Sequence, residues 1–235
     1  MTSIRVSEPT RQFSKRIEVK LYIEVVISMQ ITGIEEQKNN KKKYNIYIDG
    51  EYHSSVDKEI LKEVKLVVGM ELSADEFNEK LEIIQYKSAL KSAFHILARS
   101  SKTQTELKRK LKEKQYPEKA ISQVMDYLKA IGYINDESYA ESFIGMMKNS
   151  AGTSSRSLYY KLAGKGVESE VIEQKLQEAE LDDYSSALRA AQKKLPGLKG
   201  DKKEKTTKLL GFLYRKGFGT DVCRRVIEEL ELEDR

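Results

Sequence analysis

The sequence predicts a mainly α-helical protein of tandem three-helix repeats in an elongated, curved array, with a small N-terminal antiparallel β-sheet. Of its 235 residues, 34% are charged and 39% hydrophobic, and only 3 prolines and 13 glycines interrupt the chain. The charged share exceeds the roughly 25% of an average soluble domain. An internal repeat with a spacing of 51 residues organises the C-terminal part of the chain. This pattern favours stacked helical units over a barrel or a membrane protein.

The residue types that carry most enzyme chemistry are scarce. Cys223 is the one cysteine, and His53 and His95 are the two histidines. A single cysteine fits a reducing compartment and excludes a disulfide framework, so we expect a cytoplasmic protein. The apolar stretch Val19–Ile31 contains charged residues and is too short to span a bilayer. Phosphate-binding loops and hydrolase motifs are absent from the sequence, so we expect no cofactor, no metal and no catalytic residue.

The N-terminal part predicts an extension followed by a small sheet. Residues 1–28 are expected to be a dispensable extension, and residues 29–85 a sheet-and-helix region. Gln30–Gln37 favours a strand, and the polar run Lys38–Lys43 is typical of a turn. Tyr44–Ile48 alternates, and Asp49-Gly50 then predicts a tight hairpin with positive φ at both residues.

The pattern becomes helical from residue 57. Asp57 is placed to cap a short helix with Ile60, Leu61 and Val64 on its apolar side. Ser73 and Glu76 have the spacing of a capping box. The segment that follows has few breakers as far as Ala98, so it is expected to form one helix or two.

The repeat aligns three segments without gaps. Its aligned positions lie at i, i+4 and i+7 in the last helix of each unit, the buried stripe of an amphipathic helix. We therefore predict that the apolar members are core residues, Cys223 included. The aligned sets are Leu107/Leu158/Leu209, Leu111/Leu162/Leu213, Lys114/Lys165/Lys216, Tyr116/Val167/Phe218, Ile121/Ile172/Cys223, Met125/Leu176/Ile227 and Leu128/Ala179/Leu230.

Each repeat is expected to contain three helices. The predicted repeats are residues 86–134, 135–181 and 182–235. First helices are predicted at 86–98, 136–148 and 183–194, second helices at 103–114, 154–165 and 203–216, and third helices at 117–130, 168–180 and 219–231. Gly166 and Gly217 are expected to supply a left-handed turn between the second and third helices. Gln115 holds that place in the first repeat. Asp182 and Asp183 are interpreted as helix caps rather than metal ligands.

Charge is distributed unevenly along the chain. Residues 99–119 hold eight basic and three acidic side chains, and residues 189–225 hold twelve and three. Residues 168–183 hold seven acidic side chains and one lysine. Such runs can simply solvate helices, but basic residues recur on the second helix of each unit. They suit either a polyanion, through phosphate contacts, or an acidic protein surface.

Several motifs in this order resemble the RecX family of RecA regulators. They are the strand Ile31–Glu35 with the Asp49-Gly50 hairpin, Glu106-Leu-x-x-Lys-Leu-x-x-Lys114, Gly132-Tyr-Ile-Asn-Asp-Glu-Ser-Tyr-Ala140 and Leu162-x-x-Lys-Gly-Val167. The match covers Gln30 to the C-terminus. Thr103 and Gln115 depart from the serine and glycine usual in the family.

The resemblance implies a non-enzymatic regulator in DNA repair and the SOS response. It implies binding to the RecA filament on DNA, with inhibition of recombination, ATPase and co-protease activity as the expected effect. We expect a monomer with weak non-specific DNA binding and no membrane contact. The residues expected to contact the partner or DNA are Arg99, Lys102, Lys108, Arg109, Lys112, Arg156, Lys161, Lys165, Arg215 and Lys216. The alternatives are a stand-alone DNA-binding regulator and a helical-repeat adaptor. Lysine-rich helices suit phosphate contact better than base readout, which weakens the first alternative.

Overall fold

The structure is a computed structural model that describes residues 28–148, 150 and 152–230. The predicted extension 1–28 therefore lies outside the described residues, except for Ser28, which is the first residue of a strand. The chain divides into two compact units. The first contains the residues up to Ser55 together with Leu66–Lys80, and the second contains Val56–Lys65 and the chain from Leu81 onward.

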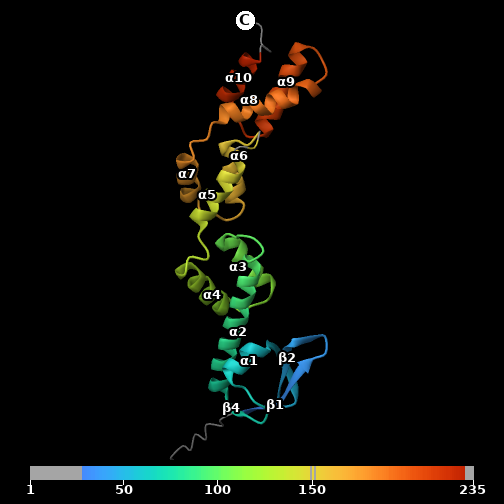
Figure 1. The fold of residues 1–235 in the computed structure, drawn as a ribbon, viewed down its shortest axis with the longest axis vertical. Coiled ribbons are helices and arrows are strands. Elements are labelled where there is room, and N and C mark those ends of the chain that lie inside the picture. Colours follow the sequence, from blue (N-terminus) through green and yellow to red (C-terminus); the bar gives the residue numbers. More distant parts are fainter. Residues whose placement is uncertain (1–27, 149, 151, 231–235) are drawn as a thin grey trace, which may run out of the picture. The chain divides into compact units, whose positions relative to one another are not determined.

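The first unit is built on a four-stranded sheet. Its strands are β1 (Ser28–Gln37), β2 (Asn40–Ile48), β3 (Glu51–Asp57) and β4 (Glu71–Ser73), in the order β3-β2-β1-β4. β1 pairs antiparallel with β2 on one side and with β4 on the other. Ile31 and Ile46 are buried, because alternate residues of a strand face the same side of the sheet. Figure 1 shows these strands in blue.

The two hairpins of the sheet differ in how well the sequence predicts them. Asp49 and Gly50 both have positive φ, 50° and 87°, so the predicted tight turn is confirmed. The prediction of a turn over Lys38–Lys43 is wrong, because β2 already begins at Asn40. The turn needs only Lys38 and Asn39. Lys41 and Lys42 are exposed on the strand, and Lys43 is half-buried.

Two helix starts near the sheet were predicted, and one of them differs in detail. Helix α1 (Lys58–Val64) begins after Asp57, but the Asp57 side chain forms no capping hydrogen bond and instead lies 3.5 Å from Lys91 Nζ. The capping box before α2 (Ala74–Leu97) is confirmed: the Ser73 N–H donates to Glu76 Oε2 at 2.9 Å and the Glu76 N–H to Ser73 Oγ at 3.3 Å. The long apolar segment is thus one helix of 24 residues.

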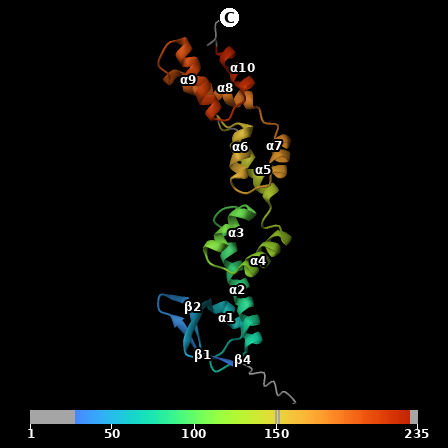
Figure 2. The ribbon, with the colours of Figure 1, turned by 180° about the vertical axis from the view of Figure 1, so that it is seen from behind.

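Three-helix repeats make up the chain from the second half of α2 onward, as predicted. The first helices are the end of α2, α5 (Asp136–Met147) and α8 (Asp183–Lys194). The second helices are α3 (Gln104–Glu113), α6 (Ser155–Ala163) and α9 (Lys202–Arg215), and the third are α4 (Glu118–Ala130), α7 (Ser169–Glu178) and α10 (Thr220–Glu229). A short 3-10 helix, Leu195–Gly197, follows α8. Figures 1 and 2 show the helices of each repeat side by side from opposite directions.

Each repeat has its own hydrophobic core. The three clusters centre on Leu107 and Leu111, on Leu158 and Leu162, and on Leu209 and Leu213, and all six leucines are fully buried. Cys223 is also fully buried, and burial raises the pKa of its thiol. The predicted repeat register is therefore confirmed. Within the part of the chain that the structure describes, no helix is long and apolar enough to cross a membrane.

The turn from second to third helix is the same in all three repeats. Gln115, Gly166 and Gly217 have φ values of 62°, 81° and 89°. The next residue in each repeat donates its N–H back to the buried leucine carbonyl, as in Tyr116 to Leu111 at 3.3 Å. This 6→1 bond is the signature of a helix that ends in a left-handed residue. Gln115 thus adopts the turn without being glycine.

Candidate partner-binding surface

Successive repeats are joined by a recurring hydrogen bond. Thr103 and Ser154 are the N-cap residues of α3 and α6, and their side chains accept from the backbone N–H three residues on. Each hydroxyl also donates to a carbonyl at the end of the second helix in the following repeat. Thr103 Oγ1 lies 2.6 Å from the Lys165 carbonyl oxygen, and Ser154 Oγ lies 2.8 Å from that of Lys216. The two donors are 51 positions apart in the sequence, and so are the two acceptors. Each of these contacts between successive repeats is called a joint below, and it recurs at the spacing of the sequence repeat.

A second bond reinforces each joint. The first N–H of α3, on Gln104, donates to Asp136 Oδ1 at 2.9 Å, and the first N–H of α6, on Ser155, donates to Asp183 Oδ1 at 2.8 Å. Both carboxylates belong to the first residue of the next repeat's first helix. Burial raises the pKa of Asp136, although the bond from Gln104 acts in the opposite direction. Asp183 therefore joins two repeats, a role that the sequence analysis did not foresee.

The joints also explain why glycine is placed where it is. A Cβ on Gly166 would lie 2.3 Å from Thr105 Oγ1, and one on Gly217 would lie 2.7 Å from Ser154 Oγ. Both residues therefore need positive φ and also the absence of a side chain. Gln115 needs only positive φ, because no three-helix repeat precedes the first one. The departure from glycine at position 115 follows from this difference.

Lys165 lies inside the first joint. Its Nζ is 2.9 Å from Glu106 Oε1 and 5.6 Å from the centroid of the Tyr139 ring. Hydrogen bonding to Tyr139 and then to Glu106 raises the pKa of Lys165. Burial alone would raise the pKa of Glu106, but the bonds from Lys165 and from the Thr103 N–H outweigh it and lower that pKa. The predicted contact residue Lys165 is thus already engaged within the protein.

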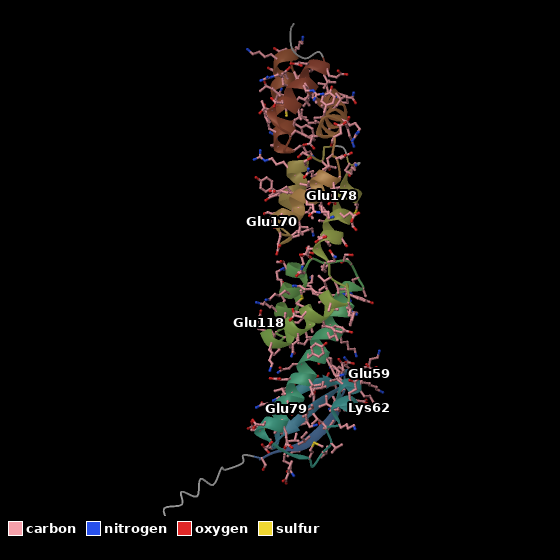
Figure 3. All side chains as sticks on the ribbon, turned by 90° about the vertical axis from the view of Figure 1, so that its left-hand side faces the viewer. Glu59, Lys62, Glu79, Glu118, Glu170 and Glu178 are labelled. Atoms are coloured by element: carbon pink, nitrogen blue, oxygen red, sulfur yellow. The ribbon has the colours of Figure 1, made fainter. Side chains whose placement is uncertain are left out.

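The three predicted basic residues of α3 are exposed but paired. Lys108 and Lys112 both contact the carboxylate of Glu118, at 2.8 and 3.0 Å. Arg109 pairs with Glu113 at 2.7 Å. Hydrogen bonds from the two lysines lower the pKa of Glu118, which lies at the start of α4 and is labelled in Figure 3. These contacts are solvent-exposed, so a partner's anion can compete for the three cations at small cost.

The remaining predicted residues of the first two repeats lie on the surface. Arg99 is exposed, with Nη2 3.1 Å from His95 Nε2, and Lys102 is half-buried beside it. Arg156 is exposed over the Tyr160 ring, and Lys161 is exposed on the same helix, α6. Three of the seven acidic residues in the segment Glu168–Asp183 lie on α7, and two of these, Glu170 and Glu178, are labelled in Figure 3. Helix α6 carries basic residues and no acidic one.

The third repeat gathers cations around aromatic rings. Arg215 and Lys216 are exposed at the end of α9. The Nζ atoms of Lys216 and Lys194 lie 5.7 and 5.8 Å from the centroid of the Phe212 ring. Arg225 lies 4.3 Å above the Tyr184 ring, within the range of a cation–π contact. Lys194 and Arg225 are not among the predicted contact residues, because those predictions were drawn mainly from the second helices, whereas Lys194 lies on α8 and Arg225 on α10.

The described residues hold no cluster of three or more histidine, cysteine or acidic side chains that could bind a metal ion. Asp182 caps α8 by accepting from the Ser185 N–H at 3.0 Å, as predicted. Hydrogen bonds from the Ser185 hydroxyl and then its N–H lower the pKa of Asp182. The described surface therefore offers cations and apolar side chains for binding.

This combination of a small sheet and three jointed three-helix repeats defines a helical-repeat protein suited to macromolecular contacts. Four RecX family models match it: the Regulatory protein RecX N-terminal domain at 29–73 and the first, second and third three-helix domains at 89–128, 135–176 and 181–227. The chain belongs to the RecX family of regulatory proteins.

Known members are similar over most of their length. Regulatory protein RecX of Clostridium beijerinckii is 33% identical over 210 residues, which cover 87% of this chain and 97% of that protein. Its counterpart in Clostridium botulinum strain Eklund 17B is 32% identical over 208 residues, covering 85% and 95%. A crystal structure of regulatory protein RecX superposes with a TM-score of 0.61 at 25% identity, over 85% of this chain and 99% of that one. RecX from Lactobacillus salivarius gives a TM-score of 0.57 over 63% of this chain and 98% of its own.

Proposed function

We propose that this protein binds the RecA recombinase filament on DNA and inhibits its recombination, ATPase and co-protease activities in DNA repair and the SOS response. It catalyses no reaction itself and acts in the cytoplasm as a monomer. Membership of a family of regulatory proteins supports this proposal, since a regulator works by contact. The observation that carries it is that α3, α6 and the end of α9 each present exposed cations, and that these second helices are linked by joints 51 residues apart.

Two joints link these three helices, so each repeat can add its own cationic contact to the same partner. Contacts made by linked modules add avidity, because the second and third bind at high effective concentration. The cations proposed to reach the partner are Arg99, Lys102, Lys108, Arg109, Lys112, Arg156, Lys161, Arg215 and Lys216. Lys165 supports them from within the joint.

Binding to filaments and to naked DNA separates this function from the alternatives. Immobilised single-stranded DNA is compared with the same DNA coated by recombinase and a slowly hydrolysed ATP analogue, at one salt concentration. The proposal expects markedly tighter binding to the coated strand. Equal or tighter binding to the naked strand would favour a stand-alone DNA-binding regulator, and binding to neither would favour an adaptor for another protein.

A further inference from the structure

An open groove lies where the first and second repeats meet. It has a volume of about 960 Å³. The end of α2 contributes Phe94 and Leu97, the connection from α4 to α5 contributes Tyr133, and α5 contributes Phe143 and Met146. Figure 1 shows these segments at the change from green to yellow.

Helix α5 presents two apolar faces, and one of them lines this groove. Ala140 and Ile144 are buried in the core of the second repeat. Tyr139, Phe143 and Met146 stand at i, i+4 and i+7 on the groove side. Met146 is 72% exposed, and across the groove Tyr133 is 61% exposed. Tyr139 and Phe143 are half-buried, with one side against the core of the second repeat, and Met146 is exposed. An apolar surface of this kind beside an open groove marks a docking surface.

The groove walls are held in place before anything binds. The Tyr139 and Phe143 rings stack at 6.3 Å, and Lys165 Nζ lies 5.9 Å from the Phe143 centroid. The Phe94 and Tyr133 rings meet edge to face at 5.2 Å. Ordered aromatic side chains lose little conformational entropy on binding, so more of the contact energy is retained as affinity.

Charge at the groove favours an acidic occupant. Among the described lining residues, Lys102 is basic and none is a carboxylate. The exposed Arg99 lies between the lining residues Ala98 and Ser100. The glutamates of α5 act on α7: the hydrogen bond that Lys175 donates to Glu178 raises the pKa of Lys175 most, and the charges of Glu137 and Glu141 raise it further. Serine and asparagine side chains in the lining can hydrogen-bond to a peptide backbone: Ser100, Ser101, Asn135, Ser138 and Ser142.

We infer that this groove binds a protein segment with one or two large apolar side chains flanked by carboxylates. The apolar side chain lies between the aromatic walls, and the carboxylates face Arg99 and Lys102. The inference rests on the proposed function, because it takes the segment to belong to the recombinase. It adds an apolar contact to the basic helices, and apolar contacts are far less sensitive to salt than exposed charge pairs.

The test measures affinity for recombinase filaments assembled on single-stranded DNA. Tyr133→Ser is compared with Tyr52→Ser, since Tyr52 is 57% exposed and, like Tyr133, packs edge to face on one neighbouring ring. Met146→Glu is compared with Met146→Lys at the same exposed position. We expect Tyr133→Ser to weaken binding about tenfold at both low and high salt. Tyr52→Ser should bind like wild type, and Met146→Glu should lose more affinity than Met146→Lys.

The possible outcomes separate this inference from the proposed function. If wild type binds filaments and both Tyr133→Ser and Met146→Glu bind them as tightly as wild type does, the groove inference is wrong and the proposed function stands. Equal losses for Met146→Glu and Met146→Lys would overturn the acidic occupant. If Tyr133→Ser loses binding to oligothymidine but still binds filaments like wild type, the groove inference is overturned and the groove is assigned to DNA. If wild type is a dimer and Met146→Glu dissociates it, the inference is overturned and the groove is assigned to a second copy of the chain. If wild type binds no filament, both proposals fail.

Discussion

The hydroxyl of Thr103 donates a hydrogen bond of 2.6 Å to the backbone carbonyl of Lys165, a residue 62 positions further along the chain. The same hydroxyl accepts from the Glu106 N–H at 3.1 Å, so one side chain both starts a helix and holds the next repeat. Ser154 and Lys216 repeat the arrangement. The geometry of the basic helices therefore depends on two small hydroxyl side chains.

Thr103→Ala is expected to lower the free energy of unfolding by about 2 kcal/mol, about half from the lost cap and half from the lost joint bond. Asp201→Ala is the matched control, because Asp201 caps α9 by accepting from the Glu204 N–H of its own repeat at 2.8 Å. It should cost about 1 kcal/mol. Urea melts measure both. Equal costs would show that the joint bond adds no stability.

Exchanging glycine and glutamine between the turns at 115 and 166 distinguishes the cost of a positive φ from the cost of a side chain that collides with the neighbouring repeat. Gly166→Gln should cost more than about 2 kcal/mol, because a side chain there strains the backbone and collides with Thr105. Gln115→Gly relieves left-handed strain and should change stability by at most about 1 kcal/mol, in the stabilising direction. Thermal melts of the two variants give the comparison. A harmless Gly166→Gln would mean that the joint is looser than described.

The repeat register is tested by its leucines. Leu111→Ala, Leu162→Ala and Leu213→Ala each remove a fully buried side chain and should cost about 2–5 kcal/mol. Lys112→Ala, on the exposed side of the same helix as Leu111, should cost less than about 0.5 kcal/mol. Denaturant melts that show the leucine variants as mild as the lysine variant would contradict the register.

The Glu106–Lys165 pair predicts a pH dependence. The fold lowers the pKa of Glu106 from its ordinary 4.5, so the pair stabilises the protein above that pH and the contribution is lost as pH falls below it. Glu106→Gln should therefore cost about 1 kcal/mol or less at pH 7 and nothing at low pH. The measurement is the difference in unfolding free energy between wild type and Glu106→Gln, followed from about pH 3 to about pH 7. A constant difference across the range would exclude the charge pair as its cause.

The sequence predicts the helices well because their information is local or periodic. Leu111, Leu162 and Leu213 recur at the repeat spacing, and Ser73 with Glu76 marks a helix start within four residues. The joint could not be predicted, because Thr103 looks like an ordinary N-cap and its second partner is far away in the sequence. The three-residue strand β4 was missed because it is too short to show alternation. The groove was missed because Tyr139, Phe143 and Met146 match core spacing, and only the packing shows that the first two are half-buried and Met146 is exposed.

The same limit applies to charge. Sequence runs identify cations but not their partners, so Lys108 and Lys112 looked free although both contact Glu118. Lys165 looked like a surface residue although it lies in the joint. Arg215 and Lys216 keep their predicted exposure. We therefore expect the third repeat to contribute more to partner binding than its two predicted residues, Arg215 and Lys216, suggest by number alone.

The most direct test of the account is the single-stranded-DNA-dependent ATPase of the recombinase, measured with wild type and with folded Arg215→Glu/Lys216→Glu across a salt series. The account predicts inhibition by wild type that weakens as salt rises, since exposed charges are screened over about 10 Å at 0.1 M. The double variant should inhibit less at every low salt concentration, and Lys108→Glu/Arg109→Glu/Lys112→Glu should show a smaller loss. Absence of inhibition by wild type at any salt concentration would contradict the account.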